Sequence, residues 1–97
     1  MEKRDYYIIL YDFYSSLLTE KQRNYFENYY FENLSLSEIS DNYNVSRNAV
    51  YKQIQITIKK LVEYEEKLSL YEKRKVLMGV INICSDEIKE KLEKISW

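Results

Sequence analysis

Proline and glycine are almost missing from this chain, whose 97 residues include no proline and a single glycine, Gly79. A β-rich domain of this length needs several tight turns, and tight turns draw heavily on these two residues. Their scarcity favours helices joined by short connections of serine, asparagine and aspartate. The sequence therefore predicts an all-α fold.

Histidine is absent and cysteine occurs once, at Cys84. One cysteine can form neither an internal disulfide nor a zinc site by itself, so we expect no metal ion and no cofactor. A single glycine cannot build a glycine-rich phosphate loop, and we identify no nucleophile–base pair. The sequence thus predicts a protein that is not an enzyme, with Cys84 as a packed thiol.

Long apolar runs are lacking as well. No stretch reaches the roughly 18 apolar residues of a transmembrane helix, and the N-terminal segment has no small-residue cleavage site of a signal peptide. Together with the lone cysteine, these absences predict a cytoplasmic protein without a membrane partner. A hydrophobic content of 45% and 97 residues suit a single domain, residues 1–97.

Positive charge is not in excess, because the chain has 15 lysines and arginines and 16 acidic residues, which gives a net charge of −1. Domains that bind DNA mainly by phosphate attraction are usually basic overall. Any nucleic-acid face must therefore be a local patch on a chain that is acidic elsewhere. The 11 tyrosines are expected at core margins, where the ring is buried and the hydroxyl reaches water.

Apolar residues at steps of three or four predict three helices in the first half of the chain. The first spans about residues 3–17, the second runs from an N-cap at Thr19 to about Glu32, and the third is short and follows Leu34. Their inward positions are Tyr6, Ile9, Leu10, Phe13 and Leu17, then Tyr25, Phe26, Tyr29 and Tyr30, then Leu36, Ile39 and Tyr43.

A long fourth helix is predicted from Arg47 to about residue 68, and a C-terminal helical segment over residues 70–96 begins with capping-box spacing at Ser69 and Glu72. Ser85-Asp86 could cap a separate sixth helix, so residues 70–96 are expected to form either one helix or two. The inward positions are Val50, Ile54, Ile58, Leu61, Tyr64 and Leu68, then Leu77, Val80, Ile81, Cys84, Ile88, Leu92 and Ile95. Solvated helix faces are predicted for Glu63, Glu65, Glu66, Glu87, Glu90 and Glu93.

The segment over residues 35–55 has the pattern of a helix-turn-helix. Ser35 and Glu38 have the spacing of a capping box, and Asn44 can adopt the left-handed conformation that a sharp turn requires. Val45 is expected to fill the turn and Ser46 to cap the following helix. Contact between Ile39 and Val50 would then fix the angle between the two helices. In such a motif the second helix enters the major groove by its N-terminal residues.

The outward side of this second helix carries the candidate nucleic-acid-binding residues. These are Arg47, Asn48, Tyr51, Lys52, Gln55 and Lys59. Arginine can pair with guanine, asparagine or glutamine with adenine, and lysine or tyrosine with phosphate. The stretch from Ser46 to Leu61 contains no carboxylate. Helix-turn-helix geometry also occurs in proteins that bind no nucleic acid, and a basic helix face is often merely solvated, so the pattern alone leaves both interpretations open.

Several blocks of this sequence resemble known helix-turn-helix proteins. LTEKQR at 18–23, followed by SEI at 37–39 and VSR at 45–47, resembles region 4 of sigma factors. The runs YDFYSSLLTEKQRNYFENYY, LSLSEIS, VSRNAVY and YEEKLSLYEK resemble the YlxM family of bacterial helix-turn-helix proteins over nearly the whole chain. The chain departs from the sigma pattern at Ser40, where alanine is usual, and at Asn44, where glycine is usual.

The resemblance implies a sigma region 4-like helix-turn-helix bundle with a long recognition helix and a C-terminal helical extension. It also implies a regulatory or accessory role, and gene neighbourhood links the family to the signal recognition particle pathway. Family positions carry over to Arg47, Asn48, Tyr51 and Lys52 as groove-facing residues. We therefore expect a DNA-binding homodimer. The alternative is an adaptor of the signal recognition particle machinery, which binds a GTPase of the particle or RNA and no DNA.

Overall fold

A computed structural model describes residues 1–83 of the chain. Over this range the chain forms helices and no strand, which confirms the predicted all-α fold there. The elements are α1 (Lys3–Tyr14), the 3-10 helix η1 (Ser15–Leu17), α2 (Glu20–Tyr30), α3 (Leu36–Tyr43), α4 (Arg47–Leu68) and α5 (Leu70–Ile83). Predictions for Cys84, Ile88, Leu92, Ile95, the Ser85-Asp86 cap and the carboxylates Glu87, Glu90 and Glu93 lie outside the described residues.

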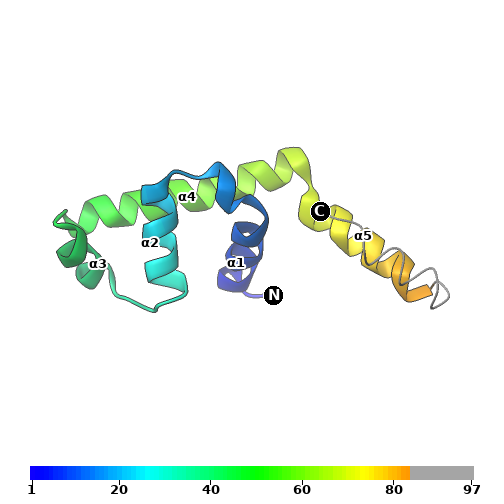
Figure 1. Cartoon of the computed structure of the whole chain (residues 1–97), viewed down its shortest axis with the longest axis horizontal. Helices are drawn as coiled ribbons and strands as arrows, with labels where there is room; N and C mark the ends of the chain where they lie inside the picture. Colours follow the sequence, from blue (N-terminus) through cyan, green and yellow to red (C-terminus); the bar gives the residue numbers. More distant parts are fainter. Residues whose placement is uncertain (84–97) are drawn as a thin grey trace.

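The long helix α4 is the axis on which the other helices are arranged (Figure 1). α1 and α2 pack against one side of α4, α3 lies at its N-terminal end, and α5 leaves from its C-terminal end. Within the described range no helix is both long and apolar enough to cross a membrane.

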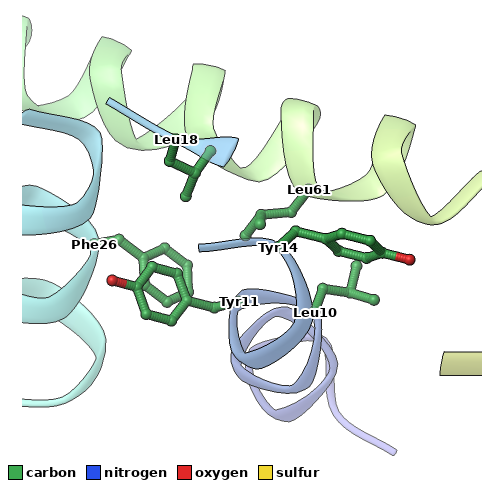
Figure 2. Packing of buried hydrophobic residues seen from close by; sticks show 6 residues of the cluster. All are labelled: Leu10, Tyr11, Tyr14, Leu18, Phe26 and Leu61. Carbon is green, nitrogen blue, oxygen red and sulfur yellow. The ribbon is translucent and has the colours of Figure 1, made fainter. Parts of the chain in front are cut away.

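The main core lies where α1, α2 and α4 meet (Figure 2). Its buried side chains are Leu10, Tyr11, Tyr14, Leu18, Phe26 and Leu61. The rings of Tyr11 and Phe26 stack almost in parallel, with their centroids 4.4 Å apart. The Tyr11 hydroxyl donates to Glu27 Oε2 at 2.8 Å, and burial, followed by this bond, raises the pKa of Tyr11. Tyrosine thus supplies core volume while its polar end remains satisfied, as the sequence predicts.

A second core lies beneath the helix-turn-helix, formed by the buried residues Tyr25, Ile39, Val50 and Ile54. Val45 packs against this cluster from the turn. The predicted placement of Ile39 and Val50 in one core is confirmed, and so is the role of Val45. This core fixes the angle between α3 and α4, because a side chain from each helix is fully buried in it.

Capping residues begin the helices at the predicted positions. Thr19 forms a capping box with Gln22, and Ser35 forms one with Glu38. The Ser46 hydroxyl accepts the N–H of Ala49 at 3.1 Å. Such caps satisfy backbone N–H groups that have no partner within the helix. Two boundaries differ slightly from the prediction, because α1 tightens into η1 after Tyr14 and α2 ends at Tyr30.

The predicted inward position is wrong for five residues, whose side chains are exposed: Leu17, Tyr29, Tyr43, Leu68 and Val80. Leu17 is 51% exposed because it lies in the 3-10 helix η1. With three residues per turn, η1 directs the Leu17 side chain away from the core, and Leu18 is buried in the core instead. Tyr43 lies at the edge of its core, with its ring 5.0 Å from that of Tyr25.

The buried stripe of α4 also differs from the prediction in its second half. The structure buries Thr57, whereas the predicted Ile58 is only half-buried. Thr57 is tolerated because its hydroxyl donates to the Gln53 carbonyl at 2.7 Å. The stripe follows helical geometry through Val50, Ile54, Thr57 and Leu61, and the next position on it is Glu65.

Glu65 is buried, so its predicted place on a solvated face is wrong. Its Oε1 accepts the Tyr14 hydroxyl at 2.6 Å and the N–H of Tyr71 at 3.2 Å, and its Oε2 accepts the N–H of Glu72 at 3.3 Å. The predicted capping box of Ser69 and Glu72 is therefore replaced by a cap from the preceding helix. Ser69 instead adopts a left-handed conformation with φ 54°, at the corner between α4 and α5.

Candidate nucleic-acid interface

The helix-turn-helix consists of α3, a three-residue turn and the start of α4. Asn44 has φ 54°, the left-handed conformation predicted for it, and the Val45 N–H closes the turn on the Ser40 carbonyl at 3.1 Å. Ser40 is buried, and its hydroxyl donates to the Ser37 carbonyl at 2.8 Å. Both departures from the sigma pattern, Ser40 and Asn44, are thus compatible with the motif because each is satisfied locally.

The N-terminus of α4 projects from this motif with two free backbone donors. Ser46 caps the N–H of Ala49, whereas the N–H groups of Arg47 and Asn48 have no hydrogen-bond partner within residues 1–83. Uncapped N–H groups at a helix N-terminus, together with the helix dipole, favour an anion. The Arg47 guanidinium adds a full positive charge at the same point.

All six candidate side chains are exposed: Arg47, Asn48, Tyr51, Lys52, Gln55 and Lys59. Asn48, Lys52, Gln55 and Lys59 follow one another at steps of four, three and four residues, so they share the face of α4 opposite its buried stripe. Arg47 and Tyr51 flank this face, and Tyr51 is 49% exposed. We call these six residues the outer face of α4.

The outer face is not neutralised by the rest of the described chain. None of its six side chains has a hydrogen bond or ion pair with another residue among 1–83, where the structure gives one ion pair, Lys75 with Glu72. On α4 the first carboxylate after Arg47 is Glu63, so the charge changes sign along the helix. The N-terminal two-thirds of α4 is a locally basic surface on an acidic chain.

Two exposed carboxylates of α3 limit where an anion can approach the motif. Asp41 is exposed in the last turn of α3, and Glu38 is exposed in the first turn. Glu38 is engaged in its capping box, where Oε1 accepts the Ser35 N–H at 3.1 Å. A polyanion would therefore meet the outer face of α4 more favourably than the exposed side of α3, because like charges repel.

Comparison with known proteins identifies the family. A family model for UPF0122, described as "Putative helix-turn-helix protein, YlxM / p13 like", matches residues 1–96. The chain belongs to the UPF0122 family. The resemblance to YlxM proteins is thereby confirmed over almost the whole chain, and with it the helix-turn-helix assignment as the family describes it.

Proteins of Shouchella clausii and Staphylococcus aureus are among the similar members of the family. The protein of Shouchella clausii (strain KSM-K16) is 54% identical over 86 residues, covering 84% of this chain and 79% of that protein. Those of Staphylococcus aureus strains MRSA252 and JH9 are 59% identical over 63 residues and 60% identical over 62 residues. These matches cover 65% and 64% of this chain, and 57% and 56% of the staphylococcal proteins. The matched region is thus little more than half the length of the staphylococcal relatives.

Sequence reasoning missed a second group of polar residues, at the helix ends of α1 and α2 that point away from α4 (Figure 1). Arg4 at the start of α1 donates to Asn33, just beyond the end of α2, and Lys3 lines the same cleft. Periodicity within one helix could not bring these residues together, because about 30 residues separate them along the chain. The pair of adjacent cations at the N-terminus was the only local signal.

Proposed function

We propose that this UPF0122 chain is a regulatory protein that binds double-stranded DNA through the outer face of α4. The observation that carries the proposal is the state of that face. It lies on the second helix of a helix-turn-helix, it is exposed and unpaired within the described residues, and no carboxylate interrupts it before Glu63. Recognition helices of this motif contact base edges through their N-terminal residues.

The dimensions of α4 suggest how its residues divide their roles. Arg47 and Lys59 are 12 residues apart, or about 18 Å along the helix axis. The major groove is about 12 Å wide, so the first two turns are the part that a groove can enclose. Arg47, Asn48, Tyr51 and Lys52 would then contact bases and nearby phosphates. Gln55 and Lys59 would reach the flanking backbone.

Because the chain has no excess of positive charge, we expect its binding to depend more on the DNA sequence than on attraction to the phosphates. With a net charge of −1, nonspecific binding is expected to be weak. The outer face of α4 offers three cations, Arg47, Lys52 and Lys59. Release of three counterions corresponds to a slope of about −2.7 in log affinity against log salt concentration for each subunit.

A homodimer would suit this mode of binding, and α5 offers a surface for it. Val76, Met78 and Val80 are exposed on α5, and Val76 is 68% exposed. Two recognition helices about 34 Å apart would fit successive major grooves on one side of a duplex. Sedimentation equilibrium of the full chain and of Val76→Glu tests this pairing, because a charge at that position should shift a dimer to monomer.

The family's link to the signal recognition particle pathway suggests where such regulation would act. The acidic balance of the chain favours a second candidate, an adaptor that binds a GTPase of that particle, or its RNA, without binding DNA. The two functions differ in their dependence on the outer face. Binding to a GTPase that survives the double variant Arg47→Ala and Lys52→Ala would support the adaptor.

A random-sequence selection tests the proposal directly, with duplex DNA and structured RNA pools run side by side at one salt concentration. The full chain should enrich a defined motif from the DNA pool, and the Arg47→Ala/Lys52→Ala variant should not. Enrichment from the RNA pool alone would favour the RNA-binding alternative. Enrichment from neither pool would contradict nucleic-acid binding.

A further inference from the structure

A cleft of about 470 Å³ is lined by residues at the start of α1 and the end of α2. These two helix ends point away from α4 (Figure 1). The N-terminal turn of α1, the last turn of α2 and the segment after it form its walls. Its lining includes two cations, Lys3 and Arg4, three tyrosines, Tyr7, Tyr29 and Tyr30, and Asn33. No carboxylate lines it, although acidic residues outnumber basic ones in the whole chain. The volume falls within the range of about 300–1,000 Å³ that is usual for small-molecule sites.

Arg4 is held in place without losing its charge. Its Nη2 donates to the Tyr30 carbonyl at 2.7 Å and to Asn33 Oδ1 at 2.9 Å. Both partners are neutral, so the guanidinium stays a full positive charge. Both bonds use one nitrogen, which leaves Nη1 and Nε available to a ligand. A guanidinium fixed in this way binds an anion with little further loss of side-chain freedom.

The backbone that holds Arg4 is itself well defined. α2 ends with the N–H of Leu34 donating to the Asn28 carbonyl at 3.0 Å, and Asn33 adopts a left-handed conformation with φ 57°. This turn presents the Asn33 side chain to Arg4. One wall of the cleft is therefore held by a backbone hydrogen bond and by the bond between Arg4 and Asn33.

The tyrosines supply flat apolar surface beside the cations. The rings of Tyr29 and Tyr30 meet edge to face, with centroids 5.0 Å apart and an angle of 83°. Tyr29 is 38% exposed, so part of its ring remains open to stacking. Burial, followed by the proximity of Tyr29 and Tyr7, raises the pKa of the Tyr30 hydroxyl.

We propose that this cleft is a nucleotide-binding site, in which Lys3 and Arg4 hold a phosphate and the base stacks on Tyr29. A phosphate suits a fixed guanidinium with a lysine beside it, and aromatic side chains stack on any base. An acidic peptide would satisfy the two cations but would leave the exposed ring unused. The bound nucleotide is either a free mononucleotide or an unpaired residue of a nucleic-acid strand, since both present the same chemistry.

This site is independent of the outer face of α4. The cleft is lined by residues at the start of α1 and the end of α2, whereas the outer face belongs to α4, and no residue belongs to both. A protein with both sites could hold a duplex by α4 and bind a nucleotide between the start of α1 and the end of α2. Variants of one surface should leave binding at the other unchanged, so the two proposals can fail separately.

Isothermal titration calorimetry of the full chain with AMP tests the site. Adenosine, inorganic phosphate, a four-nucleotide adenylate strand and a short Asp-Glu peptide are titrated in parallel. The variants are Lys3→Gln, Arg4→Gln and Tyr29→Ala. Glutamine is shorter than arginine, so Arg4→Gln removes the charge together with the bonds of Nη2 to Tyr30 and Asn33. Lys3→Gln removes a charge without removing these two bonds. Arg47→Ala is the matched control, because it removes a cation from the other surface.

AMP should bind, with Lys3→Gln and Arg4→Gln each weakening binding about tenfold and Tyr29→Ala weakening it at least about fivefold. Arg47→Ala should bind AMP as the parent does. Tighter binding of the strand than of AMP would assign the site to unpaired nucleic acid, and the reverse would assign it to free nucleotides. The proposal is overturned if millimolar AMP gives no binding, if adenosine or phosphate alone binds equally well, if the peptide binds more tightly, or if Arg4→Gln has no effect.

Discussion

The Tyr14 hydroxyl donates to Glu65 Oε1 at 2.6 Å, joining two residues that are 51 positions apart in the chain. The same hydroxyl accepts the N–H of Leu70 at 3.1 Å. Glu65 in turn accepts two N–H groups from the first turn of α5. A buried tyrosine of α1 and a buried glutamate of α4 thus set the direction in which α5 leaves the body of the protein.

Replacing Glu65 by alanine should lower the free energy of unfolding by about 2–3 kcal/mol. The substitution leaves the buried Tyr14 hydroxyl without its acceptor and removes the cap from two N–H groups of α5. Glu66→Ala is the matched control, since Glu66 is an exposed carboxylate one residue away and should change stability by less than about 0.5 kcal/mol. Urea unfolding of the three proteins measures the difference. Equal stability of Glu65→Ala and Glu66→Ala would mean that the Tyr14–Glu65 contact contributes little.

The same contact predicts a loss of stability in alkaline solution. Burial, followed by the bond to Glu65, raises the pKa of Tyr14 to about 12 from its ordinary value of 10.0. Between these values the unfolded chain releases the Tyr14 proton while the folded chain retains it, so the free energy of unfolding falls as pH rises. Tyr14→Phe removes this contribution. Urea titrations from pH 8 to pH 11 should show a shallower decline above pH 10 for Tyr14→Phe than for the parent chain, and parallel declines would refute the assignment.

Features set by neighbours in the chain were predictable from the sequence. Capping by Thr19, Ser35 and Ser46, the left-handed Asn44 and the start of α4 depend on residues within four positions of each other. The burial of Glu65 was not predictable in this way, because its partner Tyr14 lies in another helix. Leu61 and Glu65 are four residues apart and share one face of α4, but the predicted stripe continued from Leu61 through the apolar Tyr64 because a carboxylate was expected in solvent.

Asn44 allows a direct test of the turn. Its φ of 54° lies in the left-handed region, where a side chain with a Cβ atom is strained and asparagine is better tolerated than alanine. Asn44→Ala should cost about 1 kcal/mol of unfolding free energy, and Asn44→Gly should be equal to or more stable than the parent. Thermal unfolding of both variants checks this order. The reverse order would show that the turn between α3 and α4 is not in this conformation.

The candidate sites differ in how far the sequence could predict them. The outer face of α4 follows from one helix and its buried stripe, so all six predicted residues are found exposed there. The cleft between Arg4 and Asn33 depends on how α1 packs beside the end of α2. No pattern within a single helix contains that information.

The central claim is that the outer face of α4 binds DNA, and one titration tests it most directly. The affinity of the full chain and of Arg47→Ala for the DNA duplex enriched by selection is measured by fluorescence anisotropy at fixed salt. Lys67→Ala is the control, because Lys67 is an exposed cation of α4 about 30 Å from Arg47. We predict that Arg47→Ala binds more weakly by about 1–3 kcal/mol with unchanged thermal stability, and that Lys67→Ala binds as the parent does. Equal affinity of Arg47→Ala and the parent chain would contradict the account.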